Sequence, residues 1–567
     1  MATTVDGTTG RSARGLTTSG LWRRQLNHYP DTGRRVLYLG IVVLATIQLY
    51  YALYIPGAVS PAIIASLHMT FSYYVYIVVV GNAVGAFGSL LAGLADRWGR
   101  ANLVAYGLVV TALLALFGVP NATSKLTFGV IYGAIAVVEG IILVATPALI
   151  RDFSPQLGRA SAMGFWTLGP VVGSLVVAIV SSSTLPHLHA WQDQFIICGI
   201  AGLVVAAIAV VALRELSPGL RDQLMVSARD RALIEARAQG IDLTESLRHP
   251  WRQMLHLDVI GSAFAIAVFL IVYYTAVGFF TIYFSSLFGY SLSKANGLGN
   301  WFWAFDAGAL IVVGIISDRV RVRKPFMVVG AVGAIVMTII FGSYAGHTHT
   351  SYATFAVTIS LLAVFLAVAY APWMASFTET VEKHNPALTA TGLAVWGWII
   401  RIVIALSTLC LPFVVSSMTP LVTYGNTVAA LSAKYAPELA TAAVIDPATK
   451  AALSANPANP AAGAKAVGEI VQAQKVSVPV ATARLKALAA VPPADQAYLA
   501  AHGAKVVSAS KAAAGQWRNW WWVAVGGEVV FIPLIFLMTG RWDPRKARRD
   551  AAQHEQRVQE ELASLRS

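Results

Sequence analysis

Charged residues are scarce in this chain. Only 12% of its 567 residues are Asp, Glu, Lys or Arg, and 57% are hydrophobic. A soluble protein of this size has about a quarter charged residues. This composition excludes a large soluble core, and repeated apolar runs of about 20 residues predict an all-α polytopic membrane protein.

Cysteine is also scarce, and the sequence lacks several metal-binding and catalytic motifs. Cys198 and Cys410 are the two cysteines, and both lie within apolar runs. A disulfide framework is therefore excluded, and no paired-cysteine or His-Glu-x-x-His pattern predicts a metal site. The sequence has no Gly-x-x-x-x-Gly-Lys-Ser/Thr phosphate loop and no serine elbow. We therefore expect no enzyme activity, no metal, no cofactor and no transport driven by ATP.

The formal net charge is +14, and the positions of the basic residues explain it. Arginines gather in the N-terminal tail, in 214–252 and in 541–566, all beside apolar runs. Basic residues on the cytoplasmic side of membrane helices produce this pattern. We expect contact with the lipid bilayer and no nucleic-acid partner.

Twelve apolar runs form two sets of six. The first set lies at about 36–58, 72–95, 101–119, 127–149, 160–182 and 194–213. The second set lies at about 258–286, 296–317, 325–344, 351–375, 389–417 and 517–540. Repeated halves are the usual architecture of secondary transporters. The sequence predicts twelve transmembrane helices arranged as two six-helix pseudo-repeats.

Loop charges predict the orientation and the domain boundaries. With a cytoplasmic N-terminus, the short outside loops contain only Lys125 and Lys294 as basic residues. We therefore expect both termini in the cytoplasm and the protein in the cytoplasmic membrane. The expected parts are a disordered tail 1–33, an N-terminal half 34–213, a cytoplasmic linker 214–257 with an amphipathic helix, a C-terminal half 258–540 and a basic tail 541–567.

The connection between the eleventh and twelfth helices is exceptional. Residues 418–516 are Ala-rich, and at about 100 residues this segment far exceeds an ordinary connection. It is predicted outside the cell, either as a small helical cap or as a partly disordered segment. The tryptophans that follow it are expected at the outer membrane interface; they are Trp517, Trp520, Trp521 and Trp522.

A charged stretch closes the second apolar run. Leu94-Ala95-Asp96-Arg97-Trp98-Gly99-Arg100 places a carboxylate, two guanidiniums and a turn glycine where a membrane helix meets water. A weaker copy, Gly314-Ile315-Ile316-Ser317-Asp318-Arg319, closes the eighth run. The first stretch resembles the signature of the major facilitator superfamily between its second and third helices, although Ala92 and Ala101 depart from the pattern. The resemblance implies a secondary transporter with a midplane substrate site.

The resemblance also implies that these stretches form conformational latches between the halves. The latch residues would be Asp96, Arg97, Gly99, Arg100, Asp318 and Arg319. Asp96 could bind the positive end of the eleventh helix near Thr389, and Asp318 the start of the fifth helix near Ser161. Such contacts contribute about 0.3–1 kcal/mol when exposed and up to about 2 kcal/mol when partly buried. Loop packing and membrane orientation alone are the alternative.

A second matched stretch opens the fifth helix. Gly164 is followed by Gly169-Pro170-Val171-Val172-Gly173, which is similar to a motif of exchangers in this superfamily. Ser174 stands where the motif has a further glycine. Small residues at helical spacing also allow close helix packing, so antiport and plain packing both explain the pattern.

Ionisable residues near mid-helix are the strongest site candidates. They are Glu139, Asp306, Arg401 and Glu528. Placing one such side chain at the bilayer centre costs about 2.5–3.5 kcal/mol, so each should face a cavity or a partner. Arg401 is the candidate substrate clamp, since a guanidinium binds a carboxylate in bidentate fashion. Asp306 either neutralises it in the empty cavity or forms a permanent structural pair with it.

Glu139 is the candidate proton-coupling residue. A carboxyl group removed from water binds a proton more readily than one in water, so such a group can carry a proton near neutral pH. Satisfaction of its carboxyl by neighbouring helices is the alternative. Glu528, in the peripheral twelfth helix, is expected to be structural or to face lipid.

Neutral side chains complete the expected cavity wall, although any one such residue is more often a packing residue than a ligand-binding one. The candidates are Gln48, Tyr50, Tyr51, Asn82, Trp166, Tyr273, Tyr274, Thr275, Trp301, Trp303, Trp396 and Trp398.

The predicted function is secondary active transport by alternating access. The expected cargo is a small organic solute, with an anion favoured by Arg401, and the proton gradient is the expected energy source. Two alternatives stay open: a proton-driven multidrug exporter, and a non-transporting membrane sensor or assembly factor. We expect a monomer.

Overall fold

The computed structural model describes residues 24–90, 98–154, 168–217, 254–320, 322–347, 349–384 and 389–540, with isolated positions at 22, at 220 and between 542 and 556. Regular structure in these ranges is helical except for two short strands, β1 (Gln25–Leu26) and β2 (Glu215–Leu216). The all-α prediction is confirmed.

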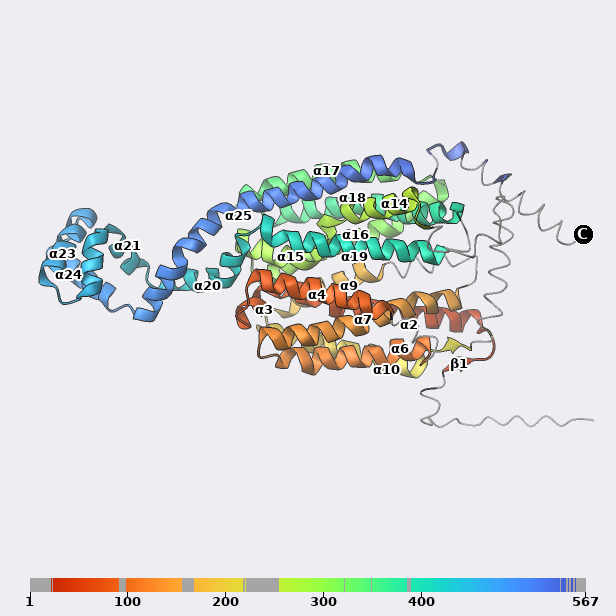
Figure 1. Cartoon of the computed structure of the whole chain (residues 1–567), viewed down its shortest axis with the longest axis horizontal. Helices are drawn as coiled ribbons and strands as arrows, with labels where there is room; N and C mark the ends of the chain where they lie inside the picture. Colours follow the sequence, from red (N-terminus) through yellow and green to blue (C-terminus); the bar gives the residue numbers. More distant parts are fainter. Residues whose placement is uncertain are drawn as a thin grey trace, which may run out of the picture.

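The helices form two sets that lie side by side in the bundle (Figure 1). The first set is α2 (Thr32–Ala58), α3 (Ser60–Ser66), α4 (Phe71–Leu90), α6 (Arg100–Leu113), α7 (Lys125–Phe153), α9 (Gly169–Thr184) and α10 (Trp191–Ala212). The second set is α14 (Leu257–Phe269), α15 (Ile271–Phe288), α16 (Leu292–Val320), α17 (Lys324–Ser343), α18 (Tyr352–His384), α19 (Thr389–Val414) and α25 (Pro493–Leu534). Short π- or 3₁₀-helical turns lie at Leu114–Gly118, Val119–Asn121, Tyr344–Gly346 and Ile535–Leu537.

Most of these helices are membrane spans by length and composition. Among the described residues, ten are long and apolar enough to cross a membrane, and α14 with α15 counts as one of them. α3 and α4 make an eleventh if the pair, bent by 115°, is one span. The apolar helix α9 is shorter, and the start of its predicted run, 160–167, lies outside the described residues. Helix positions agree with most of the predicted runs to within a few residues, but α18 continues to His384 and α25 begins at Pro493. The total of twelve stays a prediction.

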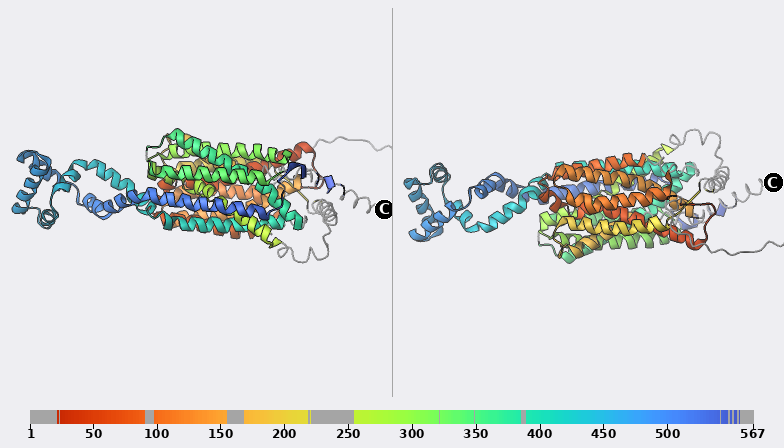
Figure 2. Two further views of the ribbon diagram at one scale, coloured as in Figure 1. Left: turned by 90° about the horizontal axis from the view of Figure 1, so that it is seen from above. Right: turned by 90° about the horizontal axis from the view of Figure 1, so that it is seen from below.

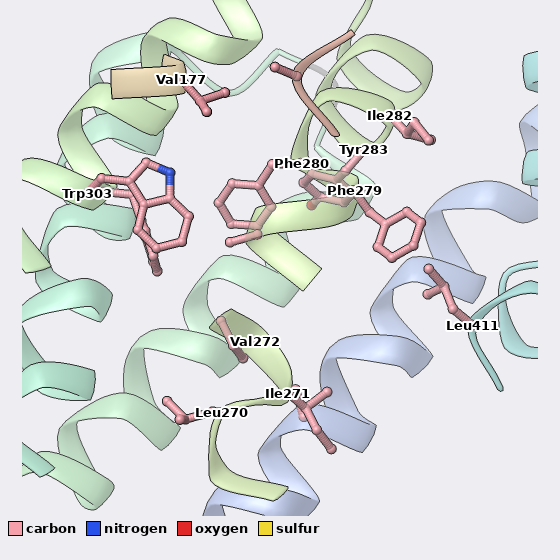
Figure 3. Packing of buried hydrophobic residues seen from close by; sticks show 14 of the residues in the cluster. Val177, Leu270, Ile271, Val272, Phe279, Phe280, Ile282, Tyr283, Trp303 and Leu411 are labelled. Atoms are coloured by element: carbon pink, nitrogen blue, oxygen red, sulfur yellow. The ribbon is translucent and has the colours of Figure 1, made fainter. Parts of the chain in front are cut away.

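Aromatic packing fills the core of the second set. Tyr283 of α15 lies with its ring centroid 4.9 Å from that of Trp517 and 5.4 Å from that of Trp521. Figure 3 shows Phe279, Phe280 and Trp303 in the same cluster.

The expected membrane-interface role is wrong for Trp517, Trp520 and Trp521. Each is at most 3% exposed, because packing against the aromatic core of the second set removes its ring from the bundle surface. Trp522, by contrast, is 54% exposed.

The segment before α2 is part of the fold. Arg24 is buried, and its Nη1 donates to the carbonyl oxygen of Ala209 at 2.9 Å. β1 pairs in parallel with β2 at the far end of α10. The predicted disordered tail 1–33 is therefore wrong for residues 24–33, since backbone pairing and a buried guanidinium hold the strand and α2 begins at Thr32. Likewise, the linker predicted at 214–257 begins with a paired strand.

The Ala-rich segment projects from the bundle as a helical arm (Figures 1 and 2). It consists of α20 (Met418–Lys434), α21 (Ala436–Val444), α22 (Pro447–Ala455), α23 (Pro460–Gln474), α24 (Val478–Ala489) and the first turns of α25. α20 packs against α25, and a small separate core forms at the tip from Ile445, Ala466, Ile470 and Ala481. We call the end of the bundle that carries this arm the extension end. The opposite end, where β1 and β2 lie, is the terminal end.

Candidate functional site

A cavity lies between the two sets of helices. Its volume is about 1850 Å³, including space open to solvent. Side chains of α2, α4, α7 and α9 line it from the first half, and side chains of α15, α16, α18 and α19 line it from the second. Three of the four ionisable candidates lie at this cavity, and Glu528 lies elsewhere.

Glu139, Asp306 and Arg401 all line this cavity. Glu139 is 2% exposed and Asp306 is 4% exposed, whereas Arg401 is half-buried. Glu139 belongs to the first half, on α7, and the other two belong to the second half, on α16 and α19. The expectation that these mid-helix groups face a common cavity agrees with this placement.

The carboxyl group of Glu139 has no protein partner in the described part of the chain. Both oxygens are buried, and neither has a hydrogen-bond partner there. Close packing of α4 against α7 positions it: a Cβ on Gly85 would lie 3.0 Å from the carbonyl oxygen of Ala136. The alternative of a carboxyl satisfied by neighbouring helices finds no support among these residues.

Asp306 and Arg401 share the cavity without forming an ion pair. No ion pair or hydrogen bond joins the Asp306 carboxylate to a described residue. The permanent Asp306–Arg401 pair, weighed above as an alternative, is therefore absent from this structure.

Among the neutral candidates, Asn82, Tyr274 and Trp396 line the cavity, and Gln48 and Tyr51 do not. The Nε2 of Gln48 donates to the carbonyl oxygen of Cys198 on α10 at 3.1 Å, and Tyr51 is 2% exposed within the first half.

Gln48 and Tyr51 were assigned wrongly to the cavity because they lie on another face of α2. Tyr50 and Tyr54, four residues apart on α2, face the cavity. A neighbour such as Tyr51 is rotated by about 100° around the helix, toward α10.

The remaining neutral candidates also divide into residues that line the cavity and residues that do not. Tyr50 and Tyr273 line the cavity, whereas Thr275 accepts a hydrogen bond from Trp520. Trp301 and Trp398 are about half exposed on the bundle surface, Trp303 is buried, and Trp166 lies outside the described residues.

Sequence reasoning missed four lining tyrosines: Tyr54, Tyr74, Tyr132 and Tyr370. The spacing of Tyr54 from Tyr50, and of Tyr132 from Glu139 by seven residues, places each pair on one helix face and could have identified two of them.

Helix contacts join the two halves near the extension end. Thr281 of α15 donates to the carbonyl oxygen of Gly57 at 2.5 Å, and the Nδ2 of Asn296 donates to that of Ala58 at 2.9 Å. Farther along the same interface, Ser293 donates to the carbonyl oxygen of Ser182 at 2.7 Å. The two halves are therefore joined at this end.

The glycines of the fifth-helix motif pack against α2. A Cβ on Gly169 would lie 2.6 Å from Cγ2 of Thr46, and one on Gly173 would lie 2.6 Å from Cβ of Tyr50. Pro170 lines the cavity at the start of α9, and Gly164 lies outside the described residues. This close approach sets the position of Tyr50 in the cavity wall.

The first predicted latch lies only partly within the described structure. Asp96 and Arg97 fall outside the described residues. Arg100 Nη1 contacts both carboxylate oxygens of Asp152, at 2.8 and 2.9 Å, which joins the start of α6 to the end of α7. Gly99 has φ +91°, and a Cβ there would overlap the carboxylate of Glu215. Glu215 in turn accepts from the backbone N–H of Arg100 at 2.6 Å.

The second latch has a matching arrangement. Arg323, just before α17, contacts Glu379 near the end of α18 at 3.2 Å and Asp318 at 2.7 Å. Asp318 and Arg319 are exposed, and the expected partner of Asp318 near Ser161 lies outside the described residues. Each half thus has an arginine at the start of its third helix paired with a carboxylate near the end of its fourth.

No metal centre is described. Among the residues that the structure places, no group of three or more His, Cys, Asp or Glu side chains is arranged to hold a metal ion.

Known proteins resemble this chain in sequence. It is 27% identical over 177 residues to the galacturonate transporter of Dickeya chrysanthemi, which covers 31% of this chain and 50% of that protein. It is 30% identical over 156 residues to the multidrug resistance protein MdtL of Shewanella oneidensis, which covers 27% of this chain and 36% of that protein. The matched part of the chain thus spans half or less of these curated relatives.

The fold also resembles a solved structure. The crystal structure of a bacterial homolog of the human lysosomal transporter Spinster, in an inward-facing and occupied conformation, matches with a TM-score of 0.56 at 16% identity. The match covers 90% of this chain and 97% of that one, and at this identity it concerns the fold alone.

A family model decides the relationship. The model of the Major Facilitator Superfamily matches residues 42–408, more than half of the chain. The chain belongs to the Major Facilitator Superfamily, which is a family of membrane transporters and not of enzymes.

Proposed function

We propose that the protein moves a small organic anion across the cytoplasmic membrane by proton-coupled alternating access. The observation that carries this proposal is the placement of one guanidinium, Arg401, and two carboxyl groups, Glu139 and Asp306, in one cavity between the halves. The similarity to a galacturonate transporter supports an organic anion as the cargo.

Charge balance links the anion to the proton. With Glu139 and Asp306 both ionised, the cavity wall has more negative than positive charge and repels an anion. A proton on one carboxyl balances Arg401, and a second proton leaves a positive excess. At an effective dielectric constant of about 20, unit charges roughly 8 Å apart interact by about 2 kcal/mol. Each proton therefore strengthens anion binding by roughly 30-fold.

Glu139 is the proposed proton site. Its buried oxygens have no hydrogen-bond donor among the described residues, so no described group competes with a proton there. Arg401 is the proposed clamp for the substrate carboxylate, because its fork geometry suits bidentate binding. Asp306, Asn82, Tyr274 and Trp396 complete the proposed substrate site.

The proposal includes the topology and the gates. The terminal end is cytoplasmic, both termini lie there, and twelve helices form two halves that act as a monomer. The hydrogen bonds of Thr281 and Asn296 form the closed gate at the extension end. Asp96, Arg97, Gly99 and Arg100, with Asp318 and Arg319, form the latches at the terminal end.

Reconstituted vesicles with an imposed pH gradient test the function. Labelled galacturonate and benzoate are the probes, and protein-free vesicles correct for passive entry. We expect accumulation of at least one probe that follows the gradient and is lost in Arg401→Ala. Gradient-driven accumulation that Arg401→Ala leaves intact would refute the anion clamp.

A matched pair of variants tests the proton site. Glu139→Gln should abolish coupling to the gradient while leaving exchange of the anion across the membrane. Glu528→Gln is the control, because Glu528 is a fully buried carboxyl in α25 that bonds Thr338 at 2.8 Å and does not line the cavity. Unchanged coupling in Glu139→Gln would show that another group carries the proton.

A multidrug exporter is the second candidate. The aromatic lining of the cavity, Pro170 at its wall and the similarity to MdtL favour it. Competition of cationic dyes for the site, together with flux that survives Arg401→Ala, would support this candidate over the first.

A further inference from the structure

The central cavity has a wall made largely of aromatic rings. Seven of its lining side chains are tyrosines, and Trp396 and Phe279 add two more rings. The rings of Tyr50 and Tyr54 lie with centroids 5.4 Å apart at 41°. Such offset arrangements leave ring faces and edges that a further planar ring can pack against.

Amide groups are rare in the same wall. Asn82 is the one amide among the described lining residues, and its Nδ2 already donates to the carbonyl oxygen of Val78 at 2.9 Å. A sugar-like solute brings several hydroxyl groups out of water. Each one left without a partner weakens binding by about 5- to 150-fold. Apart from the tyrosine hydroxyls and Thr408, the described lining has few neutral side chains that could replace this water, so the wall suits an apolar, planar body better than a polyhydroxylated one.

Two hydrogen-bond donors in the wall have no partner. The hydroxyl of Tyr274 and the Nε1–H of Trp396 are both buried, and neither bonds to any described residue. The indole of Trp396 is held by Trp373, whose ring centroid lies 5.8 Å away. Buried polar groups in proteins are nearly always satisfied, and a bound solute is one source of the missing acceptor for these two donors.

The charge of the wall limits the number of carboxylates. Arg401 is the one cation among the described lining residues, and Glu139 and Asp306 are the two acids. A second carboxylate on the substrate would have no cationic partner and would face these acids. One negative charge therefore fits this cavity better than two.

From these observations we infer that the substrate is an aromatic monocarboxylate. Arg401 binds the carboxylate, and the N–H of Trp396 and the hydroxyl of Tyr274 donate to its oxygens or to a ring substituent. The ring packs among Tyr50, Tyr54 and the tyrosines of α15 and α18. This inference rests on the proposed organic-anion transport and specifies the class of anion.

Calorimetric titration of the full-length protein in detergent tests the inference with three probes. Benzoate, cyclohexanecarboxylate and galacturonate each carry one carboxylate on a six-membered ring. Benzoate should bind at least about 10-fold more tightly than galacturonate. It should also bind about 2- to 10-fold more tightly than cyclohexanecarboxylate, because ring–ring contacts add to area burial.

Two tryptophans on one helix provide a matched pair of variants. Trp396→Phe keeps a ring and removes the unpaired donor, so benzoate affinity should fall by about 10-fold or more. Trp398→Phe makes the same change two residues away on the exposed surface and should leave affinity unchanged. Tyr274→Phe provides an independent test of the second donor and removes only a hydroxyl.

The outcomes separate this inference from the function on which it rests. Tighter binding of galacturonate, or equal binding of benzoate and cyclohexanecarboxylate, would overturn the aromatic class and leave organic-anion transport intact. Equal losses in the Trp396 and Trp398 variants would overturn the donor assignment. Binding of cationic dyes with no binding of any carboxylate would overturn both the inference and the proposed function.

Discussion

Gly57 offers the sharpest test of the proposed closed gate. It lies near the end of α2, where a Cβ would overlap the carbonyl oxygen of Val277 and lie 3.4 Å from Cα of Gly278. Thr281 donates to the Gly57 carbonyl oxygen in the same contact. An added methyl group therefore pushes α2 away from the backbone of α15, which cannot rotate aside as a side chain can.

The expected magnitude follows from this contact. Overpacking a close interface costs about 1–3 kcal/mol. Gly57→Ala should therefore shift the balance between closed and open extension ends by about 5- to 150-fold toward the open form. Ala also favours a helix over Gly by about 1 kcal/mol, but this gain applies to both conformations of α2 and cancels.

Spin labels across the extension end measure the shift. Leu188 and His347 are exposed at this end, one in each half, and suit Cys substitution and labelling. Cys410 is exposed and must be replaced first, whereas Cys198 is buried. The label–label distance should lengthen in Gly57→Ala and stay unchanged in Gly40→Ala, a control on the same helix with no atom within 4 Å of the added Cβ. An unaltered distance distribution in folded Gly57→Ala protein would refute the assignment of this contact as the gate.

Three further predictions concern the stability of the parts. Asp152→Asn should lower the free energy of unfolding by about 1–3 kcal/mol, because it removes the carboxylate that Nη1 of Arg100 contacts. The two side chains are 9% and 18% exposed, and thermal unfolding in detergent measures the change. Glu379→Gln should cost about 1 kcal/mol or less by the same measurement, since Glu379 is 42% exposed beside Arg323. Replacing 436–492 with a short Gly/Ser turn should leave folding and flux intact, because the tip has its own core and its supporting helices stay paired. Loss of flux in that deletion would show that the arm takes part in transport.

Helix positions could be predicted because the bilayer requires long apolar runs with little charge. The predicted run 194–213 corresponds to Trp191–Ala212, and the run 325–344 to Lys324–Ser343. The N-terminal end of α25, at Pro493, could not be predicted from hydropathy. No proline interrupts 494–532, and the Ala-rich residues before Trp517 have high helix propensity, so the helix continues far outside the bundle.

Cavity residues were predicted most consistently where chemistry restricts them. An ionisable group in a membrane helix must face a cavity or a partner, and Glu139, Asp306 and Arg401 obey this rule. Aromatic residues pack equally well into a core, as Trp517 and Trp521 do, so their location depends on which helix face meets which neighbour. Tyr50 and Tyr51 are adjacent and similar in chemistry, and only the packing of α2 between α9 and α10 separates their roles.

Two ion pairs, each within one half, indicate how the proposed coupling between proton and substrate would depend on movement between the halves. Arg100 with Asp152, and Arg323 with Glu379, each tie neighbouring helices within one half. Movement between the halves leaves these pairs intact and shifts one half against the other. Glu139 lies in the first half and Arg401 in the second, so such movement changes the separation of the proposed proton site from the proposed anion site. Their electrostatic interaction varies inversely with this separation, and a proton on Glu139 therefore favours one arrangement of the halves over the other.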